Sequence, residues 1–229
     1  DPRAQLHGDV QKFMTGVYGT MAAAVAITAG ALFAFSSSDA FLQLFFGYDA
    51  ASGVFYGSGM QYVLIFGPMV YIMLFGGRIP TMSRGGALAG LAAYAVMIGG
   101  MISYFPIVYG VGSMGAMLLV TAGMFGAMAA FGYFTKKDLT GAGQFLTMAA
   151  LGLLIAFFVS FFIPGVYFWV CAIGVFVFAG LTAYDTQRIK QAYMMNGGSG
   201  NLAVIGAFML YASFMNIFIF LMHLFGSSD

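Results

Sequence analysis

The sequence predicts an all-α, polytopic membrane protein: a bundle of seven transmembrane helices. Hydrophobic residues make up 62% of the 229 residues and charged residues only 7%, and the mean hydropathy is +0.95. Soluble domains carry roughly 25% charged residues, so this chain could not cover its surface with polar groups in water. With a net charge of only +1, no nucleic acid partner is expected, and the expected surroundings are membrane lipids.

Stretches without charged residues give the number of helices, because a transmembrane helix needs about 20 apolar residues. The stretch 85–135 is long enough for two helices, with a break near Phe105-Pro106 and Gly110. The stretch 139–184 holds two more, divided by the turn signal Pro164-Gly165. The other three helices are expected at roughly 13–35, 59–77 and 202–225.

The positive charges support seven helices and predict their orientation. On this map every Lys and Arg falls on the N-terminal side of the membrane: Arg3, Lys12, Arg78, Arg84, Lys136, Lys137, Arg188 and Lys190. The opposite loops hold Asp39 and Asp49 but no cation, so the N-terminus is expected inside and the C-terminus outside. We therefore expect an inner polar tail over 1–12, without a signal-peptide pattern, one transmembrane domain over 13–226 and an outer tail over 227–229.

Aromatic residues predict which helix ends lie at the membrane surface, and small residues predict which helix faces pack closely together. The segment Phe41 to Phe46 is too short to span, so it either lies in the outer interface or packs over the helix ends. An interfacial aromatic belt is expected from Tyr104, Tyr109, Tyr167 and Trp169. Small-xxx-small spacing predicts close packing within the bundle, in preference to a dimer interface, for Gly19/Ala23, Gly123/Ala127 and Gly126/Ala130.

Residues suited to catalysis are scarce, so an enzyme is not expected. The chain has no Glu, and His7 and His223 fall on opposite predicted sides. No zinc-protease motif, phosphate-binding loop or Ser-His-Asp set fits the helix map. The single Cys171 excludes an intrachain disulfide and is expected to be a small buried hydrophobe. No cofactor is expected, apart from possible Ca²⁺.

Asp185 is the one acid placed at the end of a predicted span, and it has two interpretations. It is a solvated residue at a helix exit, paired with Arg188 three residues later. Alternatively, the sixth helix continues through Lys190 and directs Asp185 into the bundle, where partial burial makes the carboxyl proton-sensitive. A charge at the edge of hydrocarbon is costly, which favours a functional role.

The last predicted helix carries a stripe of small and polar residues. Gly206, Ser213, Asn216 and His223 recur at spacings of seven, three and seven, which places them on one face. Asn216 in mid-membrane is expected to bond to a neighbouring helix, with the lining of a water-filled path as the alternative. His223, near the outer end, is expected to be an exposed interfacial residue.

Four segments together resemble the Bax inhibitor-1 (transmembrane Bax inhibitor motif, TMBIM) family, especially its bacterial YccA-like members. They are Ala183-Tyr184-Asp185-Thr186-Gln187-Arg188-Ile189-Lys190, Lys136-Lys137-Asp138-Leu139, Phe105-Pro106-Ile107-Val108 and Leu210-Tyr211-x-x-Phe214-x-Asn216-x-Phe218. The resemblance covers nearly the whole chain. It implies a seven-helix bundle with the last helix central, and roles as a pH-sensitive calcium leak channel, a stress or cell-death suppressor, or a partner of a membrane-bound AAA protease.

One position departs from the family pattern. The resemblance implies a proton-sharing pair of carboxylates, of which Asp185 matches the first, whereas Ser213 stands where the second is expected. One Asp with Ser213, Asn216 and backbone carbonyls would form only a weak Ca²⁺ site, because this ion prefers several oxygen ligands that include carboxylates. The family's arginine near the inner ends of the second and third spans corresponds to Arg84, with Arg78 as second choice.

We therefore expect an ion-leak or ion-homeostasis protein with weakened pH gating. Asp185 is the expected gate and weak Ca²⁺ ligand, Ser213 and Asn216 line the same cavity, and Arg84 or Arg188 acts as counter-ion. The alternative is a non-conducting regulatory or accessory subunit of a larger complex, such as a membrane protease or a mitochondrial assembly. The expected location is a bacterial or mitochondrial inner membrane.

Overall fold

The computed structural model describes residues 2–197 and 201–227, and within them it is almost entirely helical. The elements in chain order are α1 (Pro2–Ser36), α2 (Asp39–Phe46), β1 (Tyr48–Asp49), β2 (Val54–Phe55), α3 (Gln61–Phe75), the 3-10 helix η1 (Gly76–Thr81), α4 (Arg84–Met101), α5 (Phe105–Phe134), α6 (Thr140–Val159), α7 (Val166–Asn196) and α8 (Leu202–Phe225). The two short strands pair antiparallel, with Tyr48 opposite Phe55. Seven helices of the described chain are long and apolar enough to cross a membrane, in agreement with the expected number.

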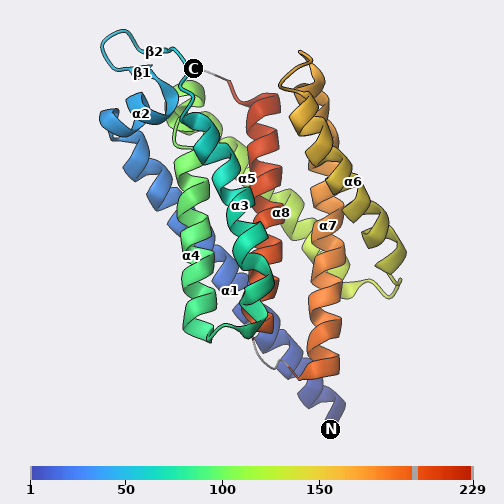
Figure 1. Cartoon of the computed structure of the whole chain (residues 1–229). Coiled ribbons are helices and arrows are strands. Elements are labelled where there is room, and N and C mark those ends of the chain that lie inside the picture. Colours follow the sequence, from blue (N-terminus) through green and yellow to red (C-terminus); the bar gives the residue numbers. More distant parts are fainter. Residues whose placement is uncertain (1, 198–200, 228–229) are drawn as a thin grey trace.

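The seven long helices form one bundle with α8 at its centre (Figure 1). Helices α1, α4, α5 and α7 all pack against α8, whereas α3 packs mainly on α4, and α6 packs on α7. The chain begins at one end of the bundle, here called the N-terminal end, and α8 finishes at the opposite, C-terminal end. The family resemblance implied this central position for the last helix.

Two helices differ in extent from the predicted spans. The first begins at Pro2, so residues 2–12 extend α1. Helix α7 continues through Lys190 to Asn196, which agrees with the second of the two interpretations of Asp185. The break expected in 85–135 is present twice: α4 ends at Met101, and Gly110 interrupts α5 with a φ of 71° that favours glycine.

A buried hydrogen-bond network joins three helices in the core. The Tyr211 hydroxyl lies 2.6 Å from Thr28 Oγ1, which is also within 3.1 Å of the Ala95 carbonyl oxygen and 3.0 Å of the Ala24 carbonyl oxygen. Because both carbonyls can only accept, Thr28 donates to one of them and accepts from Tyr211. This network fixes α8 against α1 and α4.

The expectation about small-xxx-small pairs is wrong for the glycines that suggested it. A Cβ added at Gly19, Gly123 or Gly126 would meet no atom of the described chain within 4 Å. The close helix approaches lie elsewhere: a Cβ on Gly132 would overlap the Ala183 carbonyl, and one on Gly143 would overlap the Tyr184 ring. Spacing alone could not distinguish these glycines, because most spans of this chain contain several.

The segment before the hairpin covers the helix ends. Leu42 and Phe46 of α2 are buried, Phe41 stacks on Phe35 of α1, and Phe46 contacts Tyr104. Of the two alternatives for this segment, the structure therefore shows packing over the helix ends.

Candidate functional site

The stretch from Ala183 to Lys190 lies inside α7, and successive residues face different neighbours. Ala183 faces Gly132 of α5, Tyr184 faces Gly143 of α6, and Ile189 faces Gly206 of α8. Asp185 is four residues before Ile189, so it lies on the same α8-facing side of α7. The motif therefore joins α7 to three other helices at once.

The Asp185 side chain is buried, with 8% of its surface exposed. The hydrogen bonds of this stretch come from Gln187 and Lys190, and none from the described residues reaches the Asp185 carboxyl. Arg188, one turn further along α7, exerts an electrostatic attraction on this carboxyl, but its side chain is exposed. No ion pair within 4.0 Å joins Asp185 to any described cation.

A second buried polar group lies beside Asp185. The hydroxyl of Thr186 is fully buried and has no hydrogen-bond partner among the described residues. Tyr18 of α1 is close to Thr186, but the geometry falls short of a hydrogen bond. Buried polar groups without a hydrogen-bond partner are rare in folded proteins, because such groups are costly.

Two residues of the motif hold the α5–α6 connection against α7. The Gln187 side chain donates to the Lys137 carbonyl at 2.8 Å and accepts from the Leu139 N–H at 2.9 Å. Lys190 donates to the Tyr133 carbonyl at 2.8 Å and lies 4.5 Å from the centre of the Tyr133 ring. Tyr133 is in the last turn of α5, where carbonyls lack helical partners and a cation is favoured.

Asn201 makes a similar amide contact at the start of α8. Its buried side chain donates to the carbonyls of Ile79 at 2.9 Å and Met82 at 2.7 Å, which fixes the α3–α4 connection to the central helix. The sequence did not predict a structural role for Gln187 or Asn201. An amide next to a span is a weak signal, because it is equally common in exposed connections.

The two polar residues predicted on α8 face different surroundings. Contacts of Ile189 with Gly206 and of Phe220 with Gly174 set the antiparallel register of α7 and α8. In this register the buried Ser213 lies about one helical turn from the level of Asp185. Asn216 instead lines a cavity, and its amide donates to the Ala212 carbonyl of its own helix at 2.8 Å. The expected Asn216 bond to a neighbouring helix is therefore not formed among the described residues.

The cavity, here called the lateral cavity, has a volume of about 750 Å³. It lies between α3, α4, the start of α5, α6, α7 and α8, and it reaches from the C-terminal end of the bundle to about its middle. Its walls include Gln61, Met69, Ile98, Tyr104, Leu153, Tyr167, Phe178, Ala212, Met215, Asn216 and His223. Ser213 is not among the lining residues, so the structure does not bring it together with Asn216 in one cavity.

His223 closes the C-terminal end of the lateral cavity and is half-buried, contrary to the expected exposed position. Its Nδ1 lies 2.7 Å from the Ile219 carbonyl oxygen, so in the neutral ring this nitrogen carries the proton. The Tyr104 hydroxyl then donates to Nε2 at 3.2 Å. The rings of Tyr109 and Tyr167 also contact His223, so three of the four residues expected in an aromatic belt pack around this histidine, whereas Trp169 is exposed.

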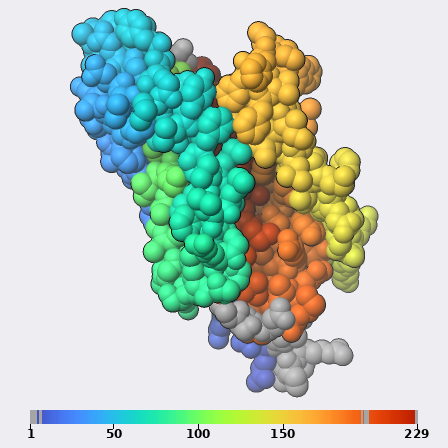
Figure 2. Space-filling view, in the orientation of Figure 1, coloured from blue at the N-terminus to red at the C-terminus, as the bar shows by residue number. Residues whose placement is uncertain are grey.

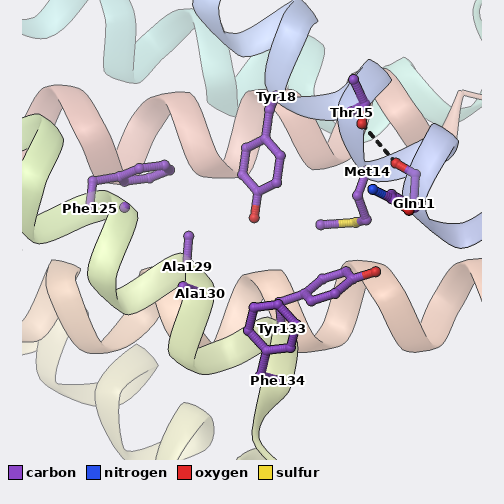
Figure 3. A pocket seen from close by; sticks show the side chains of 10 residues that line it. Gln11, Met14, Thr15, Tyr18, Phe125, Ala129, Ala130, Tyr133 and Phe134 are labelled. Atoms are coloured by element: carbon purple, nitrogen blue, oxygen red, sulfur yellow. Dashed lines mark hydrogen bonds between the residues drawn. The ribbon is translucent and has the colours of Figure 1, made fainter.

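The predicted counter-ion arginines lie at the N-terminal end of the bundle. Arg84 is the first residue of α4, Arg78 belongs to η1, and both side chains are exposed. Neither forms an ion pair with Asp185 in the described part of the chain. A further groove of about 680 Å³ lies between α1 and α5, and Tyr18 points across it from α1 (Figure 3).

No described cluster of three or more His, Cys, Asp or Glu side chains could hold a metal ion. Asp185 is therefore the only described acidic ligand available for a cation inside the bundle.

Known proteins are similar to this chain over nearly its whole length. The family model described as "Inhibitor of apoptosis-promoting Bax1" matches residues 10–229. The chain belongs to the Bax inhibitor-1 family. It is 34% identical to the inner membrane protein YbhL of Escherichia coli over 99% of this chain and 96% of that one.

Other bacterial relatives align over similar lengths. A protein of Caulobacter vibrioides is 37% identical over 96% of this chain and 90% of its own. Protein RP147 of Rickettsia prowazekii is 31% identical over 95% and 90%. The chain is thus a Bax inhibitor-1 family protein of the inner membrane with several transmembrane helices.

Proposed function

We propose that this Bax inhibitor-1 family protein provides a cation leak, with Ca²⁺ as the expected ion, and that Asp185 controls it. The supporting observation is the buried Asp185 carboxyl between α7 and α8, which no described group neutralises at ion-pair distance. An intramembrane acid without a partner is costly and is retained mainly where it acts on ions or protons. Ionised Asp185 attracts the cation, and its protonation shifts the bundle between closed and open packings.

Weakened pH gating follows from the other titratable groups near α7. Helices α1, α5, α6 and α8 contact α7. Their described titratable side chains are Asp9, Lys12, Tyr18, Tyr109, Tyr133, Tyr211 and His223, and α7 itself adds Tyr167, Cys171, Tyr184, Arg188, Lys190 and Tyr193. The only other acid, Asp9, is exposed near the start of α1. Two carboxylates that share a proton lose their two protons in separate steps, and the shared proton is held to higher pH because both groups cannot be charged at once. A single acid has no such partner to hold its proton.

Calcium flux into proteoliposomes tests this proposal. Vesicles that contain the purified chain should take up Ca²⁺ faster than protein-free vesicles of the same lipid composition. Arg84 and Arg188 are the proposed counter-ions, so their Gln variants should change the rate of uptake. Equal uptake with and without the protein would contradict a leak.

A second candidate is a non-conducting accessory subunit, and Ser213 favours it. A scaffold has no need of the second carboxylate that the family resemblance implies at this position. Its partner would be a membrane complex such as an AAA protease. Extraction in mild detergent followed by native gels distinguishes the candidates: a large complex together with no Ca²⁺ uptake supports the subunit, and a free monomer contradicts it.

A further inference from the structure

The lateral cavity opens sideways, between α3 and α6. At the C-terminal end these helices are joined by aromatic rings: Phe66 stacks on Phe158 at 5.8 Å, and Tyr62 contacts Phe161. Further toward the N-terminal end, the described parts of α3 and α6 do not pack on each other. In the space-filling view the surface is hollowed here, and atoms of α8 are visible between α3 and the α6–α7 pair (Figure 2).

The opening faces the place where lipid is expected. Both flanking helices belong to predicted membrane spans, and they direct large apolar side chains outward, including Val70 on α3 and Met148 on α6. The hydrocarbon region of a bilayer would therefore lie directly against the opening. A ligand could enter from the membrane without crossing water.

The lining of the cavity is polar at one end and apolar over the rest of its length. Gln61, Tyr104, Tyr167 and His223 lie at its C-terminal end, and no charged side chain is among the described lining residues. Toward the middle of the bundle the walls are formed mainly by apolar groups such as Met69, Leu153, Phe178 and Met215, with Tyr94 and Asn216 as the polar residues. This distribution matches an amphiphile whose polar part remains at the C-terminal end.

We propose that the lateral cavity binds one acyl chain of a membrane phospholipid. A volume of about 750 Å³ is in the range of ligand-binding sites, which are mostly apolar with a few polar groups. Water is a poor occupant, because each molecule needs two to four polar partners and the deep walls offer only Tyr94 and Asn216, whose amide already bonds to its own helix. The polar groups at the C-terminal end are positioned to meet the ester and headgroup region.

This site is separate from the proposed cation gate. The cavity reaches Phe178 on α7, and Asp185 lies two helical turns further toward the N-terminal end. An acyl chain in the cavity would fill the space between α3 and α6 and would exclude water from this side of α8. The lipid site therefore stands whether or not the protein conducts Ca²⁺.

Photo-crosslinking tests the proposal. The whole chain is reconstituted into phosphatidylethanolamine vesicles that contain a small share of the same lipid with a diazirine in one acyl chain. After illumination, labelled residues are located by mass spectrometry. Met215 is 4% exposed and Met148 is 72% exposed, so bulk lipid labels only Met148, whereas an acyl chain in the cavity also labels Met215.

Variants that fill the cavity with a larger side chain test whether the labelling of Met215 comes from inside the cavity. Ala212→Phe fills the cavity from α8 and should abolish labelling of Met215 while leaving that of Met148 unchanged. Ala150→Phe, from the opposite wall, should do the same and covers the case in which the first variant does not fold. Leu119→Phe, at a 75% exposed position on α5, adds the same ring outside the cavity and should change neither signal.

Three results would overturn the proposal. In the first, Met215 of the native chain remains unlabelled. In the second, Ala212→Phe and Ala150→Phe fold but Met215 is still labelled. In the third, a diazirine fatty acid labels Met215 but the diazirine phospholipid does not.

Discussion

At the scale of single residues, the chemistry of this protein concentrates on one acid. All seven acidic residues are Asp, and Asp185 is the only one placed within an apolar span rather than in a tail, a connection or the start of α1. The next residue, Thr186, lies close to Tyr18 of α1, and its buried hydroxyl has no hydrogen-bond partner among the described residues. Ser213, about one turn away on α8, supplies no second charge.

Ser213→Asp should therefore shift the pH gating of the leak. The new carboxyl would lie close enough to Asp185 for like-charge repulsion, so the pair would share a proton and titrate as a unit. Because the shared proton is held to higher pH, the pH at which Ca²⁺ uptake by proteoliposomes changes should move upward relative to the native chain. Ser160→Asp, which adds an acid at the end of α6 rather than between α7 and α8, is the control and should leave the pH profile unchanged.

The sequence predicted part of this site. Asp185 was identifiable because a charge next to a long apolar run is conspicuous, but periodicity could not decide between a solvated helix exit and a buried position. The roles of Gln187, Asn201 and His223 depend on contacts with residues 48 to 122 positions away. No local pattern contains that information.

At the scale of helices and connections, α7 is the element that organises the N-terminal end of the bundle. Its Gln187 and Lys190 hold the connection after α5, and Asn201 at the start of α8 holds the connection after α3. Asp138 in the first connection accepts hydrogen bonds from the Thr140 hydroxyl at 2.6 Å and N–H at 2.9 Å. These bonds lower the pKa of Asp138, so it remains ionised at physiological pH.

Gln187→Ala should destabilise the protein by about 2 kcal/mol, because it removes two hydrogen bonds and leaves a part-buried carbonyl and N–H unsatisfied. Thermal unfolding in detergent measures the effect. Gln191→Ala, one turn further along α7 at an exposed position, is the matched control and should change the stability little. Equal stability of both variants would show that the amide contact is not structural.

Two glycines of α5 should respond in opposite ways to the same added methyl group. Gly132→Ala should cost about 1–3 kcal/mol of stability, since its Cβ would overlap the Ala183 carbonyl of α7. Gly123→Ala should be neutral or stabilising by up to about 1 kcal/mol, because Ala favours the helix and the position is open. Unfolding temperatures in the same detergent would reveal the difference, and a reversed order would contradict the packing of α5 on α7.

At the scale of the whole molecule, composition was sufficient for the class and number of helices. Charge-free stretches located the spans because charge is excluded from hydrocarbon. Which helices pack on one another could not be predicted from the sequence. The glycines chosen by their spacing face open space, and the lateral cavity arises because α3 and α6 diverge. Such features depend on the fit of distant helices, which a single sequence does not encode in any short pattern.

The orientation in the membrane is a prediction that fusion proteins can test. With all eight cations on one side, the C-terminus should face outside. In a bacterial host, alkaline phosphatase fused after Asp229 should therefore be active, and green fluorescent protein at the same place should be dark. Bright fluorescence with an inactive phosphatase would reverse the orientation.

The role of Asp185 is tested most directly by the pH dependence of Ca²⁺ flux in proteoliposomes. Uptake by the native chain should differ between mildly acidic and mildly alkaline pH, because the buried carboxyl gains or loses its proton. In Asp185→Asn the rate should be the same at both, whereas Asp138→Asn, at an exposed acid, should behave like the native chain. A pH dependence that persists unchanged in Asp185→Asn would contradict its role as the gate.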